Sequence, residues 1–169
     1  MTPGRLRRYR SEDQAACLDL FDSNTPRYFA EAERPDYAAY LEALDPTATD
    51  EAYFVIEAAG QVVACGGLFV RPGGTEAGLA WGMVARPHHR QGYGRQLWQA
   101  RLDWTRQHAP QVRVVRLDTT GHSAPFFARL GFVTTQVQPD FYAPGLDRHD
   151  MRLDLPPAGA PAQAATMAP

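Results

Sequence analysis

Residues 89–95, with the sequence His-Arg-Gln-Gly-Tyr-Gly-Arg, carry the clearest chemical signal in the chain. Two glycines two positions apart let the backbone turn tightly and leave its N–H groups uncovered. An apolar run precedes the stretch at residues 79–84 and a helical pattern follows at residues 97–104, which predicts a turn between a strand and a helix. The first N–H groups of such a helix have no intrahelical partner and lie at the positive end of its dipole. The stretch therefore predicts an anion site, most often for a phosphate, with Arg90 and Arg95 adding charge.

Composition and charge are those of one soluble globular domain. The 169 residues are 44% hydrophobic and 21% charged, which suits a single domain with its own core. The formal net charge of −2 gives no argument for nucleic acid or a membrane surface, and no apolar run approaches the length of a membrane span. The two cysteines, Cys17 and Cys65, form no disulfide framework, and the N-terminus lacks a secretory apolar region. We therefore expect a cytoplasmic protein with reduced thiols, and a disordered Pro/Ala-rich tail at residues 156–169.

Ahead of the turn, the sequence predicts a short strand, two helices and an antiparallel hairpin. Residues 11–14, Ser-Glu-Asp-Gln, have the pattern of a capping box and should begin the first helix. Pro35 should begin the second helix, because apolar residues then recur at helical spacing. Residues 53–57 and 61–70 should pair as strands, and Gly66-Gly67 within the second indicates a bulge or a close backbone approach.

After the turn, the sequence predicts a parallel strand and then a short helix with two more strands. The mostly apolar residues 112–117 follow a helix that follows a strand, which indicates a β-α-β unit with parallel strands. A short helix over residues 126–130 should end at Gly131. Phe132 should begin a strand, and residues 149–155 alternate as a last strand, with an aromatic loop between the two.

Two other kinds of site are disfavoured by residue type. His88, His89 and His122 do not predict a metal site, because adjacent histidines point apart and no cysteine or carboxylate completes a ligand set. A nucleotide-binding phosphate loop needs a lysine after its last glycine, and this chain contains no lysine. We therefore expect no metal and no such loop.

The order of the elements, together with two motifs, resembles the GNAT family, the Gcn5-related N-acetyltransferases, over about residues 6–155. The family's motif Gln/Arg-x-x-Gly-x-Gly/Ala corresponds to residues 89–94, with His89 at the Gln/Arg position. Its later motif, a Tyr before a helix end and Gly-Phe, corresponds to residues 127–132, with Phe127 at the Tyr position. The resemblance implies an α+β (mixed α/β) GNAT fold in one domain over residues 1–155. Its central sheet would be mixed and mostly antiparallel, with six to seven strands, a splayed parallel pair and about four flanking helices.

The resemblance also implies an activity and a cofactor. Acetyl-CoA would lie where the strands at residues 78–84 and 112–117 splay apart, and its acetyl group would pass by direct attack, in a ternary complex, to a primary amine. A backbone N–H near Met83 would polarise the thioester carbonyl. By this resemblance the cofactor-binding residues are Met83, Val84, His89, Arg90, Gln91, Gly92, Tyr93, Gly94, Arg95 and Thr120.

The proton chemistry is left open by the sequence. The attacking amine must be neutral, so a base or a water chain is needed. Glu76, at the start of the central strand, and His122, in the loop after its parallel neighbour, are candidates, although both are also explained as exposed polar residues. Tyr142 either supplies a proton, lines the acceptor site or packs in the core. Phe127 cannot donate a proton, which keeps an acyl-CoA-binding sensor without transfer activity as an alternative.

The acceptor pocket is expected to include Asn24, Tyr28, Phe29 and Tyr142. Tyr28 and Phe29 are equally explained as core residues under a loop. The aromatic content favours a small-molecule amine or an amino acid as the acceptor, while a peptide N-terminus or a protein lysine stays open. A homodimer is consistent with the resemblance, and we expect neither nucleic acid nor a membrane as a partner.

Overall fold

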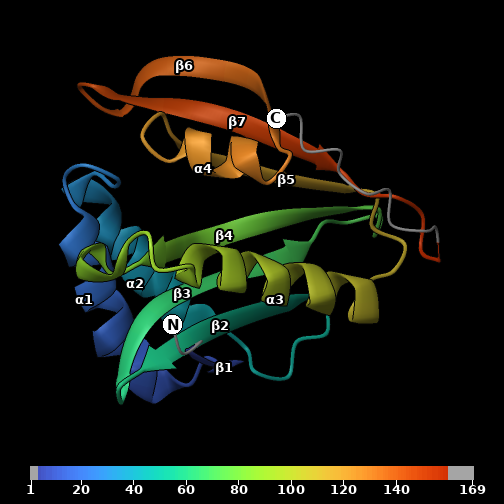
Figure 1. Cartoon of the computed structure of the whole chain (residues 1–169), viewed down its shortest axis with the longest axis horizontal. Coiled ribbons are helices and arrows are strands. Elements are labelled where there is room, and N and C mark those ends of the chain that lie inside the picture. The colour runs from blue at the N-terminus through green and yellow to red at the C-terminus, as the bar shows by residue number, and fades with distance from the viewer. Residues whose placement is uncertain (1–3, 160–169) are drawn as a thin grey trace.

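The computed structural model describes residues 4–159, and among them lie one seven-stranded sheet and four α-helices (Figure 1). The strand order is β1-β2-β3-β4-β5-β7-β6, and every neighbouring pair is antiparallel except β4 and β5, which are parallel. The predicted mixed, mostly antiparallel sheet with one parallel pair is therefore confirmed. In chain order the strands and α-helices are β1 (Arg5–Arg8), α1 (Gln14–Asn24), α2 (Arg34–Ala43), β2 (Glu51–Ala58), β3 (Gln61–Val70), β4 (Glu76–Val84), α3 (Tyr93–His108), β5 (Val114–Thr120), α4 (Ala124–Arg129), β6 (Val133–Ala143) and β7 (Leu146–Asp154).

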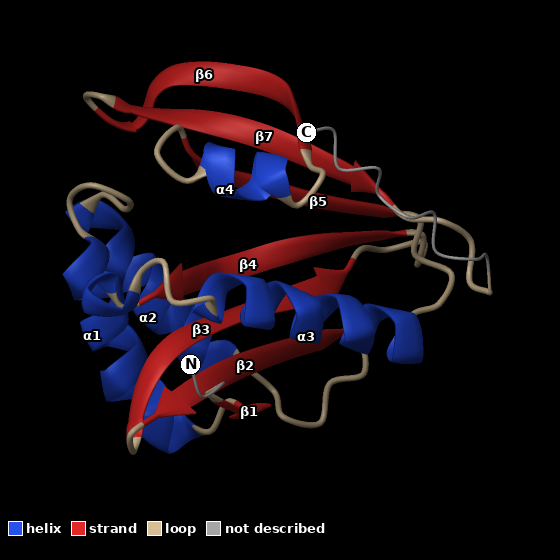
Figure 2. Ribbon diagram, viewed as in Figure 1, coloured by secondary structure: helices blue, strands red, loops and turns tan. Residues whose placement is uncertain are grey.

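Helices cover both faces of the sheet, as Figure 2 shows. Tyr53 and Val55 of β2 pack with α1 and α2, whereas the intervening Phe54 and Ile56 pack with α3. This alternation follows from the two-residue period of a strand, and it explains why β2 is apolar on both faces. A third cluster joins α3 and α4 to β5 and β7, with Trp98 of α3 in an edge-to-face contact with Phe132.

The predicted capping box at residues 11–14 is wrong. The chain first forms a short 3₁₀ turn, η1 (Ser11–Asp13), and the carboxylate of Asp13 accepts the N–H of Arg10 at 2.8 Å. Arg7 also binds this carboxylate through both terminal nitrogens at 2.7 Å, which lowers the pKa of Asp13. A charged oxygen pair can bind an amide and a guanidinium together, which the hydroxyl of Ser11 cannot do.

The end of the chain differs from the prediction in one further place. The aromatic segment expected as a loop near residue 140 belongs to β6, which runs to Ala143 with an irregular register against β7 between Gln138 and Ala143. Residues 156–159 form neither a helix nor a strand, and residues 160–169 of the predicted tail lie outside the described residues.

The feature that shapes the centre of the molecule is the short pairing of β4 with β5. The two strands pair at Glu76 with Val114, at Ala77 with Val115 and at Gly78 with Arg116, and no later pair joins them within residues 4–159. The strands therefore separate beyond Gly78, and Figure 1 shows the opening between them.

A bulge in β4 lies beside this opening. Cys65 of β3 pairs with Met83, but Gly67 pairs with Ala80, so two residues of β4, Trp81 and Gly82, oppose the single residue Gly66. The bulge predicted at Gly66-Gly67 is thus present, with the extra residue in the partner strand. Trp81 has a φ of 43°, a left-handed conformation that a residue with a side chain adopts only when its surroundings impose it.

Candidate active site

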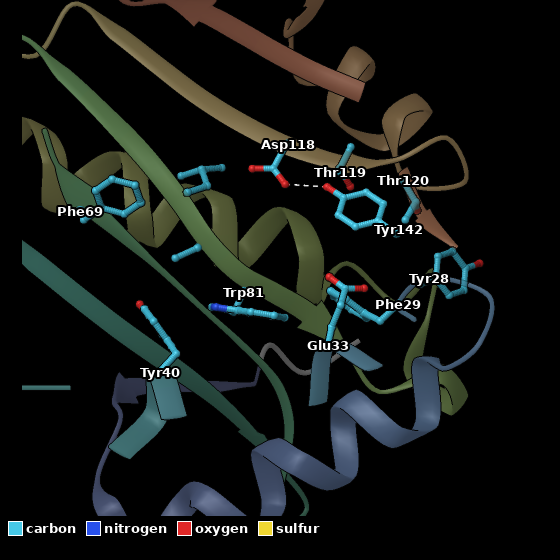
Figure 3. A pocket seen from close by; sticks show the side chains of 12 residues that line it. Tyr28, Phe29, Glu33, Tyr40, Phe69, Trp81, Asp118, Thr119, Thr120 and Tyr142 are labelled. Carbon is cyan, nitrogen blue, oxygen red and sulfur yellow. Dashed lines mark hydrogen bonds between the residues drawn. The ribbon is translucent and has the colours of Figure 1, made fainter. Parts of the chain in front are cut away.

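A cavity of about 360 Å³ lies at the opening between β4 and β5 (Figure 3). Its walls come from the segment between α1 and α2, from α2, from the two separated strands, and from the β6–β7 hairpin. Its lining residues are Tyr28, Phe29, Glu33, Tyr40, Phe69, Leu79, Ala80, Trp81, Asp118, Thr119, Thr120 and Tyr142. The cavity therefore combines residues that lie more than one hundred positions apart in the sequence.

The backbone of the bulge is held by a buried chain of hydroxyl groups. Tyr53 donates its hydroxyl proton to the carbonyl oxygen of Trp81 at 2.8 Å. Tyr37 lies 2.8 Å from the Tyr53 oxygen and 3.2 Å from the sulfur of Cys65. Because Tyr53 uses its proton on Trp81, Tyr37 donates to Tyr53 and the Cys65 thiol donates to Tyr37. Tyr37, Tyr53 and Cys65 are almost fully buried, so each donor and acceptor in this chain depends on the next.

On the α3 face of the sheet, a buried arginine lies against the bulge. The terminal nitrogen Nη1 of Arg101 lies 3.5 Å from the carbonyl oxygen of Gly67, and burial lowers the pKa of Arg101 to about 10. A Cβ atom at Gly66 would lie 2.9 Å from the Cα atom of Gly82, too close for any side chain. Glycine at Gly66 therefore lets the two strands approach at the bulge, and the guanidinium of Arg101 fills the space above them.

The glycine turn predicted as an anion site leads into α3. Gly92 precedes the helix with a φ of 90°, which favours glycine. The carbonyl of Gly92 accepts the N–H of Gln96 at 3.0 Å, so the three amides between them lie before the first hydrogen bond of the helix. Arg90 and Arg95 are exposed, and no ion pair to either is found within residues 4–159. The turn thus offers free amides and free positive charge.

The side chains of the other predicted cofactor residues are used inside the protein. His89 directs Nε2 to the carbonyl oxygen of Val84 at 2.9 Å and to Oδ1 of Asn24 at 3.1 Å. Tyr93 and Met83 are buried in the cores on opposite faces of the sheet. The side-chain amide of Gln91 donates to the carbonyl of Pro87 at 3.3 Å. The side chains at these positions are therefore used within the protein, and the carbonyl of Val84 is bound by Asn24 and His89.

Thr120 is the predicted cofactor residue whose side chain does line the cavity. Thr120 is 4% exposed, and its hydroxyl has no hydrogen-bond partner within the described residues. A buried hydroxyl without a partner is unfavourable by about 1–3 kcal/mol. The Thr120 hydroxyl is therefore positioned to bind a polar group of a ligand in the opening.

Three further polar side chains enter the cavity: Glu33 from the segment before α2, Asp118 from β5 and Tyr142 from the β6–β7 hairpin. Glu33 lies in the 3₁₀ turn η2 (Glu31–Glu33), and its Oε2 accepts the N–H of Ala30 at 2.8 Å. Tyr142 of the β6–β7 hairpin donates its hydroxyl proton to Oδ2 of Asp118 at 2.5 Å. Burial raises the pKa of Glu33 and, together with the bond to Asp118, raises the pKa of Tyr142. The site therefore holds a desolvated carboxyl group opposite a tyrosine–aspartate pair.

The predicted catalytic residues lie in three different places. Tyr142 lines the cavity, whereas His122 lines a second, more open groove beside it and contacts the ring of Tyr28 edge-on at 6.3 Å. Glu76 lies where β4 and β5 are still paired, outside the lining of either. Arg116 binds both oxygens of Glu76 at 3.0 and 3.2 Å and lowers its pKa, which makes this carboxylate a weaker base.

The predicted acceptor residues are likewise divided. Tyr28 and Phe29 line the cavity, and Phe29 stacks on Trp81 with ring centroids 6.2 Å apart. Asn24 is 2% exposed and is not part of the lining. Its side-chain amide donates to the carbonyls of Leu20 and Val84 at 2.8 and 2.9 Å, which ties the end of α1 to the end of β4. Asn24 therefore connects two elements next to the site and does not itself line the cavity.

Sequence reasoning missed several residues that line the cavity, above all Glu33, Asp118 and Trp81. Asp118 follows the mostly apolar residues 114–117 of β5, and a polar residue at that point is a recognisable signal. Glu33 and Trp81 carry no such signal, because one is a glutamate in a charged segment and the other an aromatic residue in an apolar strand. Phe127, which replaces the expected tyrosine, lies in α4 and packs against Phe126 and Phe132.

The described residues contain no cluster of three or more His, Cys, Asp or Glu side chains arranged to hold a metal ion. No helix within residues 4–159 is both long and apolar enough to span a membrane.

Comparison with known proteins identifies similar sequences and folds. A family model described as "Acetyltransferase (GNAT) family" matches residues 16–132. A comparison with curated proteins gives no match. Among solved structures, a putative acetyltransferase of the GNAT family from Desulfovibrio desulfuricans is 21% identical with a TM-score of 0.73, covering 89% of this chain and 98% of that one.

Two further solved structures have the same fold. The putative acetyltransferase yncA from Salmonella typhimurium, solved with its cofactor acetyl-CoA, is 19% identical with a TM-score of 0.71, covering 95% of this chain and 98% of that one. The ribosomal-protein-S18-alanine N-acetyltransferase from Escherichia coli is 17% identical with a TM-score of 0.71, covering 95% of this chain and 99% of that one. At these identities the similarity establishes the fold alone.

Proposed function

The chain belongs to the acetyltransferase (GNAT) family, and from that premise we propose that it moves an acetyl group from acetyl-CoA to the primary amine of a small molecule or an amino acid. The observation that carries the proposal is the opening between β4 and β5 beyond Gly78. The glycine turn lies at one end of β4, and the cavity with its polar side chains lies at the opening itself. A donor and an acceptor can therefore meet between the two strands.

Acetyl-CoA fits the residues on the donor side. It supplies an acetyl group as a thioester, attached through an extended arm to a pyrophosphate. The free amides after Gly92, with Arg90 and Arg95, suit the pyrophosphate. Within residues 4–159, the backbone of β4 beyond Gly78 has no strand partner on the β5 side, and the hydroxyl of Thr120 has no hydrogen-bond partner. These groups suit an extended polar arm, and the solved structure of yncA with acetyl-CoA supports the same choice of cofactor.

Tyr142 and Asp118 are the groups that we assign to the amine's proton. The hydroxyl of Tyr142 accepts a proton from the attacking amine while it passes its own proton to Asp118 along their hydrogen bond. Because the pKa of Tyr142 is raised, its hydroxyl works better as a relay that stays neutral than as a free base. Phe127 has no proton to give, so water supplies the proton that the departing thiol requires. Glu76 has no part in this scheme.

A peptide or protein N-terminus is the second candidate acceptor. The open groove beside the cavity has a volume of about 730 Å³ and is lined by the loop before η2 and by the β6–β7 hairpin. Tyr142 belongs to the lining of both the cavity and the groove, so a chain lying in the groove would present its end to the cavity. The structure from Escherichia coli is that of a ribosomal-protein-S18-alanine N-acetyltransferase, which adds support for this candidate.

The proposal is tested by following free thiol and N-acetylated product with acetyl-CoA and a panel of small amines, amino acids and short peptides. We expect turnover with the small amines. Tyr142→Phe should lower kcat by about 100-fold because it removes the relay, while calorimetry shows unchanged acetyl-CoA affinity. An unchanged kcat in Tyr142→Phe would contradict the proton assignment. Acetyl-CoA binding without turnover across the whole panel would instead favour the acyl-CoA-binding sensor.

A further inference from the structure

The cavity is acidic and aromatic. Among the described residues that line it, Glu33 and Asp118 are the only acidic side chains and none is basic. Six of the twelve lining residues are aromatic, and Figure 3 shows Tyr142 beside Asp118 and Phe29 near Glu33. Aromatic faces and carboxylates both attract cations, and a desolvated cation benefits from both at once.

The two carboxylates enter the cavity from opposite walls, as Figure 3 shows. Asp118 comes from β5, beside the opening where the thioester would lie, and Glu33 comes from η2, next to Tyr28 and Phe29. One acidic group therefore lies near the reacting end of the cavity, and the other lies across from it.

The charge of Asp118 is partly balanced within the protein. Its Oδ2 accepts the hydroxyl proton of Tyr142, and its Oδ1 lies 3.8 Å from a terminal nitrogen of Arg148. Arg148 is shared, because its Nε donates to Asp150 at 2.8 Å. The carboxylate of Asp118 therefore has partners for its charge before it accepts the proton in the relay.

The charge of Glu33 is not balanced. Only the Ala30 N–H binds it, and no arginine or histidine pairs with it within residues 4–159. Arg34, its neighbour in sequence, is paired with Asp22 at 2.7 Å, and Arg27 lies over the ring of Tyr28. Burial raises the pKa of Glu33, and the negative charges of Asp118 and Asp36 raise it further. A cationic group bound beside Glu33 would offset both the burial of the ionised carboxylate and its repulsion by Asp118 and Asp36.

Resting on the function proposed above, we propose that the acceptor is an aliphatic amine with a second positive charge, such as a diamine, and that Glu33 binds this second charge. The reacting amino group lies at Tyr142 and Asp118, and the distal ammonium lies at Glu33 among the rings of Tyr28 and Phe29. An amino acid is disfavoured, because its free carboxylate would enter a cavity that already holds two.

The test compares three acceptors of equal carbon chain length: diaminobutane, butylamine and aminobutanoate. We measure kcat/KM for each by thiol release at saturating acetyl-CoA. We expect diaminobutane to exceed butylamine by about tenfold, as one charge-assisted hydrogen bond provides, and aminobutanoate to fall below butylamine. Calorimetric titration of diaminobutane into the protein without acetyl-CoA provides a readout that does not depend on turnover.

Glu33→Gln keeps an acceptor for the Ala30 N–H but removes the charge. In this variant the ratio of kcat/KM for diaminobutane over butylamine should fall to near one, and binding of diaminobutane should weaken about tenfold. The matched control is Glu31→Gln, which removes a charge from the exposed start of the same 3₁₀ turn, outside the lining of the cavity. The control should keep the wild-type ratio.

Turnover of butylamine or aminobutanoate as efficient as that of diaminobutane would overturn this inference and leave the proposed function standing. A wild-type preference that survives in Glu33→Gln, or is lost equally in Glu31→Gln, would overturn the role of Glu33. No turnover of any amine in the panel would overturn the proposed function, and this inference with it.

Discussion

The anion site at the glycine turn can be tested with two variants of nearly equal shape, Gly92→Asp and Gly92→Asn. Gly92 has a φ of 90°, so either side chain strains the backbone by about 1–3 kcal/mol. A Cβ atom there meets no other atom within 4 Å, so neither variant is blocked by packing. The two variants share the same backbone strain and differ in charge. The difference between their affinities for CoA therefore isolates the electrostatic part of cofactor binding.

The expected size of that difference follows from Coulomb's law. A carboxylate about 5 Å from one unit of phosphate charge is repelled by about 3 kcal/mol at an effective dielectric constant of about 20. Gly92 is exposed, so solvent and salt reduce the repulsion to about 1–2 kcal/mol. We therefore expect Gly92→Asp to bind CoA about tenfold more weakly than Gly92→Asn does.

The assay is calorimetric titration of CoA into each variant at low and at high salt, after thermal unfolding shows equal stability of the two. The difference in affinity should shrink at high salt, because the screening length falls. Equal affinities of the two variants at low salt would refute the placement of the pyrophosphate at this turn. A difference that does not change with salt would show that charge is not its cause.

Two further predictions concern the buried and half-buried groups around the cavity. Tyr53→Phe leaves the Trp81 carbonyl without its donor, so unfolding in urea should show a loss of about 1–3 kcal/mol together with a lower kcat. Lost stability with an unchanged kcat would show that Tyr53 does not position the bulge for catalysis. The pKa of Glu33 is raised in the folded state, so ionisation of this carboxyl destabilises the fold once the pH exceeds the ordinary pKa of a glutamate. Below about pH 4 the carboxyl is protonated in both the folded and the unfolded state, and the effect is absent. Glu33→Gln should therefore raise Tm at pH 7 and leave it unchanged below pH 4, and an equal shift at both pH values would disprove the desolvation of this carboxyl.

Local patterns in the sequence were sufficient for most of the fold. The two-residue alternation of the strands, the helical spacing after Pro35 and the glycines of the turn each act within a few residues. The same holds for Gly66-Gly67, where a bulge or a close backbone approach was predicted and a bulge lies opposite Gly66 in β4. The capping box failed because Arg7 and Asp13 form an ion pair that is stronger than a hydroxyl cap.

The acceptor side of the site could not be predicted to the same depth. Its position depends on the register of β4 against β5, which places Glu76 at the paired end and Asp118 at the separated end. Neither strand shows this register in its own sequence. Glu33 enters the cavity because η2 lies opposite β5 in the fold. That no cationic side chain pairs with Glu33 among residues 4–159 is evident only from the positions of its neighbours in space.

The most direct test of the central claim measures both products of one reaction. The protein is incubated with acetyl-CoA and a small primary amine, free thiol is measured, and the N-acetylated amine is quantified by mass spectrometry. Acetyl transfer between the separated strands predicts that thiol and N-acetyl product appear in equal amounts, and that both appear far more slowly in Tyr142→Phe. Release of thiol without N-acetyl product would contradict the claim, because water rather than an amine would then be the acceptor.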